Sequence, residues 1–141
     1  MSNLERAIAI AAEAHAGQQD KVGEAYILHP LRVMLAVSSP DERIVGVLHD
    51  LVEDTPWTLE GLRAAGFSAE VVDAIDAVTR REGEDYFDFV LRAGANPLAR
   101  PVKIADLRDN LDLTRIAAPV QRDHDRCERY RKALALLGER E

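Results

Sequence analysis

Apolar side chains recur every three or four positions along most of the chain, which is the spacing of amphipathic helices. The first such run covers residues 4–14 and ends before Gly17, a residue typical of helix ends. The same pattern, with Pro, Ser or Thr near the starts, predicts further helices over residues 30–37, 40–54, 58–65, 68–78, 86–91, 101–113 and 120–137. No strand pair, repeat or linker interrupts this pattern. We therefore expect one all-α domain over residues 1–141, built from seven or eight helices.

Length and composition agree with a single globular domain. The chain has 141 residues, of which 47% are hydrophobic and 30% are charged. Its one cysteine, Cys127, excludes an internal disulfide or a cysteine-built zinc site and fits a reducing cytosol. Apolar runs stay far below the ~20 residues of a membrane-spanning helix. The N-terminal segment carries Glu5 and Glu13 and lacks the architecture of a signal peptide.

The chain is acidic, with a formal net charge of −7. Such a surface repels long nucleic acids. It is compatible with a small nucleotide whose phosphates meet a bound cation. We therefore expect a small-molecule partner and neither a nucleic acid nor a membrane.

The segment 44–55 (IVGVLHDLVEDT) carries the densest group of chemical side chains. On a regular helix, one arc holds His49, Asp50, Glu53 and Asp54, and the opposite arc is aliphatic. Gly46 falls on the polar arc and predicts room for something to approach the helix. The carboxylates repel one another unless a cation or protonation relieves them, and imidazole with carboxylate suits a first-row divalent metal. A solvated polar face is the equally weighted alternative.

A second segment, residues 102–111, places polar groups beside an apolar helix face. Asp106 and Asn110 share a face at i,i+4, and Lys103 precedes Asp106 by three positions. Asp106 is a candidate metal ligand, Asn110 a candidate for hydrogen bonding to a ligand, and Lys103 a candidate partner for a phosphate. An ordinary surface ion pair is the competing interpretation.

The remaining candidates are the other histidines and the cysteine. His29 precedes Pro30, so we expect it in an extended conformation at a helix entrance. We expect His15 to be structural or to support the site residues from behind, and His124 to be solvated. We expect Cys127 to be a buried or half-buried apolar residue without a chemical role.

Together these segments resemble the HD superfamily of metal-dependent phosphohydrolases. The resemblance is closer still to the hydrolase domain of RelA/SpoT-type proteins and to the small stand-alone alarmone hydrolases. It rests on AHAGQ around residues 15–18, DKVGEAYILHP at 20–30, LHDLVEDT at 48–55 and VKIADLRDN at 102–110, in the family order.

The resemblance implies an all-helical fold and a divalent ion, most commonly manganese, held by His29, His49, Asp50 and Asp106. It implies that Glu53 and Asp54 position and activate the attacking water. It also implies that Asn110 and Lys21 contact the nucleotide. The expected reaction releases pyrophosphate from the 3′ position of (p)ppGpp.

The loop before His29 departs from the family pattern. The stretch 20–25 (DKVGEA) is shorter than the Arg- and Ser-rich form common in alarmone hydrolases, and Ala25 replaces a frequent proline. Two alternatives therefore remain beside (p)ppGpp hydrolysis. One is a phosphohydrolase for another nucleotide or phosphorylated metabolite, and the other is a nucleotide-binding module without turnover.

Overall fold

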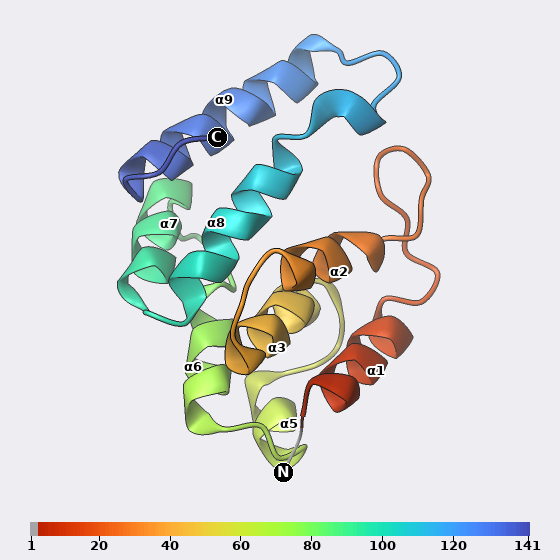
Figure 1. Cartoon of the computed structure of the whole chain (residues 1–141), viewed down its shortest axis with the longest axis vertical. Helices are drawn as coiled ribbons and strands as arrows, with labels where there is room; N and C mark the ends of the chain where they lie inside the picture. The colour runs from red at the N-terminus through yellow and green to blue at the C-terminus, as the bar shows by residue number, and fades with distance from the viewer. Residues whose placement is uncertain (1–2) are drawn as a thin grey trace.

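The computed structural model describes residues 3–141 as a bundle of α-helices (Figure 1). Its α-helices are α1 (Leu4–Ala14), α2 (Leu28–Leu35), α3 (Pro40–Leu48), α4 (Leu51–Asp54), α5 (Leu59–Ala64), α6 (Ala69–Ala77), α7 (Tyr86–Ala95), α8 (Ala99–Asn110) and α9 (Gln121–Leu136). A 3-10 turn, η1 (Leu113–Arg115), follows α8. Within residues 3–141 the β-structure is limited to an isolated bridge between Gln19 and Ala25. The predicted all-α class is confirmed.

Polar caps define most helix starts, as the sequence indicates. Ser39, Thr58 and Ser68 each accept a hydrogen bond from the backbone amide three residues later. Such a cap satisfies one of the backbone amides that a helix start leaves without a partner. Proline adds to the start of α3, where Pro40 is the first helical residue.

Two hydrophobic clusters hold the bundle together. The larger one packs α1, α2, α3, α5, α6 and one side of α8, with Val33, Val45 and Leu48 fully buried at its centre. The smaller one joins α7, α8 and α9 through Val90, Leu107 and other apolar side chains. Helix α8 therefore links the two halves of the molecule (Figure 1). No helix within residues 3–141 has both the length and the apolar character needed to cross a membrane.

The helix predicted over residues 40–54 is interrupted at His49 and Asp50. Asp50 has φ −102° and ψ 2°, which lies outside the helical range, and α4 begins at Leu51. In an unbroken helix, neighbouring side chains diverge by about 100°. The interruption lets the two side chains approach each other instead. With α3 and α4 taken as one interrupted helix, the described chain has eight helices, within the predicted range.

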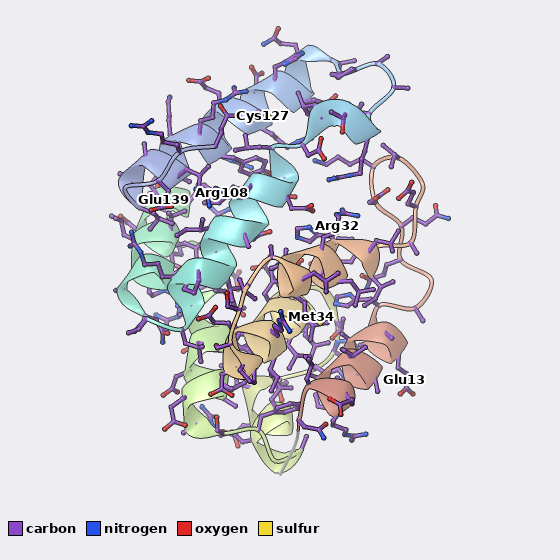
Figure 2. All side chains as sticks on the ribbon, in the orientation of Figure 1. Glu13, Arg32, Met34, Arg108, Cys127 and Glu139 are labelled. Atoms are coloured by element: carbon purple, nitrogen blue, oxygen red, sulfur yellow. The ribbon has the colours of Figure 1, made fainter. Side chains whose placement is uncertain are left out.

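Two local predictions near the site are wrong. His29 is not extended but lies in the first turn of α2, with Pro30 as the third helical residue. Proline is tolerated there because the first amides of a helix have no intrahelical acceptor. The position of Gly46 is not open to a ligand, since a Cβ added there would lie 3.2 Å from the Cα of Met34. The glycine instead lets α3 touch the backbone of α2, near the Met34 labelled in Figure 2.

Candidate metal centre and active site

Four side chains from three separate segments of the sequence converge where α2, α8 and the α3–α4 break meet. The His29 Nε2 atom lies 3.2 Å from His49 Nε2 and 3.0 Å from Asp106 Oδ1. The Asp50 Oδ2 atom lies 3.0 Å from His49 Nε2 and 3.7 Å from His29 Nε2. His49 Nε2 and Asp106 Oδ1 are 3.4 Å apart. The structure thus brings together all four ligands that the sequence predicts.

The opposite nitrogen of each imidazole has its own acceptor. His29 Nδ1 lies 2.6 Å from Asp109 Oδ2, and His49 Nδ1 lies 2.7 Å from the carbonyl oxygen of Gly46. A carboxylate and a carbonyl accept hydrogen bonds, so in the neutral rings the Nδ1 atoms carry the protons. Both Nε2 lone pairs then face each other and two carboxylate oxygens. Two imidazole nitrogens and two carboxylates with such outer partners are a donor set that fits a divalent transition metal.

The carboxylates of this cluster are themselves oriented. The hydroxyl of Tyr26 donates to Asp50 Oδ2. Asp106 accepts from Lys103 Nζ at 3.1 Å on Oδ2 and from Asn110 Nδ2 at 3.0 Å on Oδ1. Burial opposes the charge of Asp106, but Lys103 and His49 outweigh burial and hold the pKa of Asp106 well below its usual range. The Asp106 carboxylate is therefore ionised and ready to bind a cation.

Glu53 and Asp54 project from the short helix α4 into the cleft above this cluster. The backbone amide of Arg80 donates to Glu53 Oε1 at 2.9 Å. The side-chain amide of Gln18 donates to the carbonyl oxygen of Asp54 at 3.1 Å. Burial, Asp50 and Glu53 raise the pKa of the Asp54 carboxyl. A carboxylate with a raised pKa is a better proton acceptor.

The cleft has a volume of about 620 Å³. Of the four converging side chains, His29, Asp50 and Asp106 line it and His49 does not. Its wall combines Tyr86, Phe89 and Tyr130 with the cationic residues Lys21, Arg80, Arg115, Arg126 and Arg129. Cationic and aromatic side chains around a carboxylate-rich floor are suited to a ligand that carries both phosphates and a ring.

Three residues are predicted to contact the substrate, and all three line the cleft: Lys21, Lys103 and Asn110. They differ in burial and in their contacts within the protein. Lys103 is buried, pairs with Asp106, and holds its ammonium 4.5 Å from the centre of the Phe89 ring. Lys21 lies at the exposed rim, where burial and then Arg126 lower its pKa. Arg43 and Arg108 lie outside the cleft. Arg43 donates to the Val37 carbonyl, and Arg108 pairs with Glu139 (Figure 2).

Sequence reasoning missed the residues that orient the ligands, Tyr26 and Asp109 above all. Arg32, labelled in Figure 2, donates through Nε to Asp109 Oδ1 at 2.8 Å, so Asp109 bridges an arginine and His29. Asp109 lies three residues after Asp106, and this spacing on one helix was an available signal. Tyr26 carried no comparable signal, because its contact with Asp50 spans 24 positions.

The exposure of His124 and the burial of Cys127 agree with the sequence. His15 is buried, its Nδ1 lies 2.9 Å from Gln18 Oε1, and its ring packs against Tyr26. His124 is exposed. Cys127 is buried at 1% exposure on α9.

The fold and this donor set define an all-helical domain with a site suited to a divalent cation. The HD domain family matches residues 7–136, and the chain belongs to this family. An HD domain implies a divalent metal ion, which agrees with the donor set above.

Curated relatives and a solved structure extend this result. The chain is 31% identical over 120 residues to a guanosine-3′,5′-bis(diphosphate) 3′-pyrophosphohydrolase of Aquifex aeolicus, covering 77% of this chain and 17% of that protein. It is 33% identical over 132 residues to a probable GTP pyrophosphokinase of Mycobacterium leprae, covering 84% of this chain and 17% of that protein. The chain therefore spans about a sixth of these relatives' length. The structure of a metazoan ortholog of SpoT, which hydrolyses ppGpp, matches with a TM-score of 0.80 over 97% of this chain and 85% of that one at 21% identity. That likeness shows the fold.

Proposed function

We propose that the chain is a metal-dependent phosphohydrolase that releases pyrophosphate from the 3′ position of (p)ppGpp. The observation that carries this proposal is the convergence of His29, His49, Asp50 and Asp106 beside Glu53 and Asp54. The names of relatives that share the domain, guanosine-3′,5′-bis(diphosphate) 3′-pyrophosphohydrolases, support the choice of substrate. The cytosol, where such a nucleotide would be met, is the expected compartment.

The two imidazole Nε2 atoms and the Asp50 and Asp106 carboxylates would hold the ion, with manganese as the first candidate. When bound, a divalent ion acts as a Lewis acid on water and on phosphate oxygens. The protein keeps the donors in place through Asp109, the Gly46 carbonyl and Tyr26. Lys103 neutralises part of the carboxylate charge at Asp106 and presents an ammonium group to a substrate phosphate.

Of the two acidic residues, Asp54 is the better candidate for the general base. Its raised pKa favours taking a proton from the attacking water onto the carboxylate. Glu53 already accepts the Arg80 amide with one oxygen, so it is better suited to orient the water with the other. Proton transfer to a carboxylate at the cleft surface lets the proton leave to solvent afterwards.

The rim of the cleft supports a polyanionic nucleotide as substrate. Burial lowers the pKa of Lys21 and the like charge of Arg126 lowers it further, and a phosphate group beside both cations would relieve their repulsion. The guanidinium of Arg129 lies 4.6 Å from the centre of the Tyr86 ring. Asn110, beside the metal ligands, offers an amide to the ribose or a phosphate. The chain as a whole has a net charge of −7, so these cations at the rim offer a local place for a polyanion.

A second candidate, hydrolysis of another nucleotide or phosphorylated metabolite, follows from the loop before His29. Asp20 Oδ1 accepts the backbone amides of Val22 and Glu24, so the loop closes as a tight turn. Lys21 is its single cation, which leaves fewer contacts for the far phosphates of (p)ppGpp.

The decisive experiment is turnover of ppGpp by the purified protein with Mn²⁺, with pyrophosphate and GDP separated and measured. We expect pyrophosphate release from wild type, a loss of about 100-fold or more in Asp54→Asn, and a similar loss in Glu53→Gln. Glu60→Gln, an exposed acidic residue of α5, serves as the matched control and should retain full activity. Folded, metal-loaded protein that leaves ppGpp intact contradicts this substrate. Turnover in a panel of other phosphorylated compounds then favours the second candidate, and nucleotide binding without any turnover favours a non-catalytic module.

A further inference from the structure

A turn outside the metal cluster, residues 79–85, is held by one arginine from α7. Arg92 donates through Nη1 to the carbonyl oxygen of Asp76 at 3.0 Å and through Nη2 to that of Thr79 at 2.8 Å. The same guanidinium binds both carboxylate oxygens of Glu84 at 2.9 Å. The Arg92 guanidinium therefore joins three places through hydrogen bonds: the end of α6, the start of the turn at Thr79 and its far side at Glu84.

The opposite side of this turn contacts the proposed active site. Arg80 sends its guanidinium back to the carbonyl oxygen of Glu84, at 3.1 Å from Nε and 3.0 Å from Nη2. Its backbone amide points the other way and donates to Glu53 Oε1 at 2.9 Å. Among residues 3–141, this amide is the single recorded donor to the Glu53 carboxylate.

We propose that Arg92 and Glu84 are positioning residues that hold the Arg80 amide against Glu53 and so orient this carboxylate for catalysis. The inference rests on the proposed hydrolase function, because it assigns Glu53 a part in the reaction. It adds two residues that touch neither the metal ligands nor the substrate cleft.

The donor to Glu53 is a main-chain group, and this is why its position depends on the turn. Any residue except proline at position 80 offers the same N–H, so the side chain at this position does not decide the contact. The place of the amide is set by the path of the turn, which Arg92 fixes through four hydrogen bonds. Without that amide, the Glu53 side chain lies exposed and samples several rotamers. Misplacing a catalytic group by about 1 Å can cost 100-fold in rate.

Lysine cannot replace the arginine at this place. An ammonium group lacks the planar fork that binds a carboxylate in two places while it reaches two carbonyl oxygens. Arg92→Lys keeps the charge and much of the side-chain volume, so it tests the fork alone. Glu84→Gln keeps the size and one carbonyl acceptor and tests the ion pair. Arg63→Lys, in an exposed pair with Glu60, is the matched control.

The first measurement is steady-state kinetics of the metal-loaded variants. We expect Arg92→Lys and Glu84→Gln to lower kcat by about 10-fold with KM within about 2-fold, the pattern of a disturbed reacting group rather than of lost binding. Arg63→Lys should match wild type. Arg92→Lys in a Glu53→Gln background should cause no further loss, because the residue that it positions is already impaired. An equal loss in that background, or unchanged kcat in the single variants, overturns the proposal.

The second measurement does not need activity. The Arg80 amide resonance, followed by NMR, should shift in Glu53→Gln and should exchange faster with solvent in Arg92→Lys, while thermal unfolding and metal content confirm the fold. An Arg80 amide indifferent to Arg92→Lys contradicts the positioning role. If wild type hydrolyses nothing but the amide responds as expected, the proposed hydrolase function fails while the contact mechanism stands.

Discussion

The Nε2 atoms of His29 and His49 face each other at 3.2 Å, although each ring directs its Nδ1 to a separate acceptor. Two lone pairs at this distance repel unless a cation or a proton lies between them. Burial alone lowers the pKa of His49, but Asp50 and Asp106 raise it well above the usual value, so the carboxylates favour positive charge at this place. The pair is therefore arranged around a positive charge rather than as a hydrophobic contact.

Removing one of these rings should empty the metal site. We expect His49→Ala to lose its bound divalent ion, because one of the four donors is deleted and His29, Asp50 and Asp106 alone leave the donor set incomplete. His124→Ala removes an exposed histidine and should keep wild-type metal content. Metal analysis of both purified variants checks this prediction. Wild-type metal content in His49→Ala contradicts the ligand assignment.

The Asp109 carboxylate, which is hydrogen-bonded to His29 Nδ1, should affect the metal affinity of the site without binding the ion itself. Asp109→Asn weakens the hydrogen bond that fixes the ring and its protonation, so we expect metal affinity to fall by about 10- to 100-fold. Asp76→Asn, at an exposed ion pair with Arg81, is the control of the same chemistry. Competition with a metal-sensitive dye measures both affinities, and equal values for the two variants argue against the role of Asp109.

The close approach of α2 and α3 should make Gly46 intolerant of any side chain. A Cβ added to Gly46 would lie 3.2 and 3.3 Å from the Met34 Cα and N atoms, which are main-chain atoms and cannot turn away. Gly46→Ala should therefore destabilise the fold by about 1–3 kcal/mol, although alanine is favoured by about 1 kcal/mol inside a helix. At Gly61 the added methyl meets side chains of Trp57 and Thr58, so Gly61→Ala should cost less. Urea unfolding of both variants provides the test, and a Gly46→Ala protein as stable as wild type would show that the helices can separate freely.

The ion pair between Glu84 and Arg92 should make stability depend on pH in the acid range. The hydrogen bond from Arg92 is the main cause that lowers the pKa of Glu84 from 4.5 to about 2. A carboxyl whose pKa falls on folding stabilises the protein above its unfolded pKa, and this contribution is lost as the pH falls from 4.5 through about 2. Glu84→Gln should therefore flatten the decline of the unfolding midpoint in this window. Thermal melts of both proteins at several pH values follow the effect, and parallel curves would refute it.

The sequence was sufficient for the helical class and for the identity of the four converging side chains. Periodicity predicted the helices because each helix buries one apolar face. The sequence motifs around His29, His49 and Asp106 supplied the family pattern. The same periodicity predicted a continuous helix through His49 and Asp50, where the helix is in fact interrupted. A local sequence pattern cannot show such an interruption, because the interruption allows His49 and Asp50 to contact α2 and α8 rather than their sequence neighbours.

The supporting contacts were also beyond the sequence. The bond from Tyr26 to Asp50 and the bond between His29 and Asp109 join segments 24 and 80 residues apart. Tyr26 belongs to no charge pattern, and the spacing of Asp109 three residues after Asp106 does not by itself indicate a contact with His29. Lys103 shows the opposite case, because its i,i+3 spacing to Asp106 was visible, but its near-complete burial was not.

The missing side chain at Gly46 has a consequence for how this domain tolerates change. Since α2 and α3 meet main chain against main chain, the spacing between His29 on α2 and His49 just after α3 depends on this backbone contact. Ordinary exchanges of core side chains leave that spacing intact. The far wall of the cleft, formed by α7 and α9, packs in a separate apolar cluster and meets the metal ligands through Lys103, which contacts both Phe89 and Asp106. A new ligand preference can thus arise from exchanges on that wall that leave Phe89 and the pair of Lys103 with Asp106 in place.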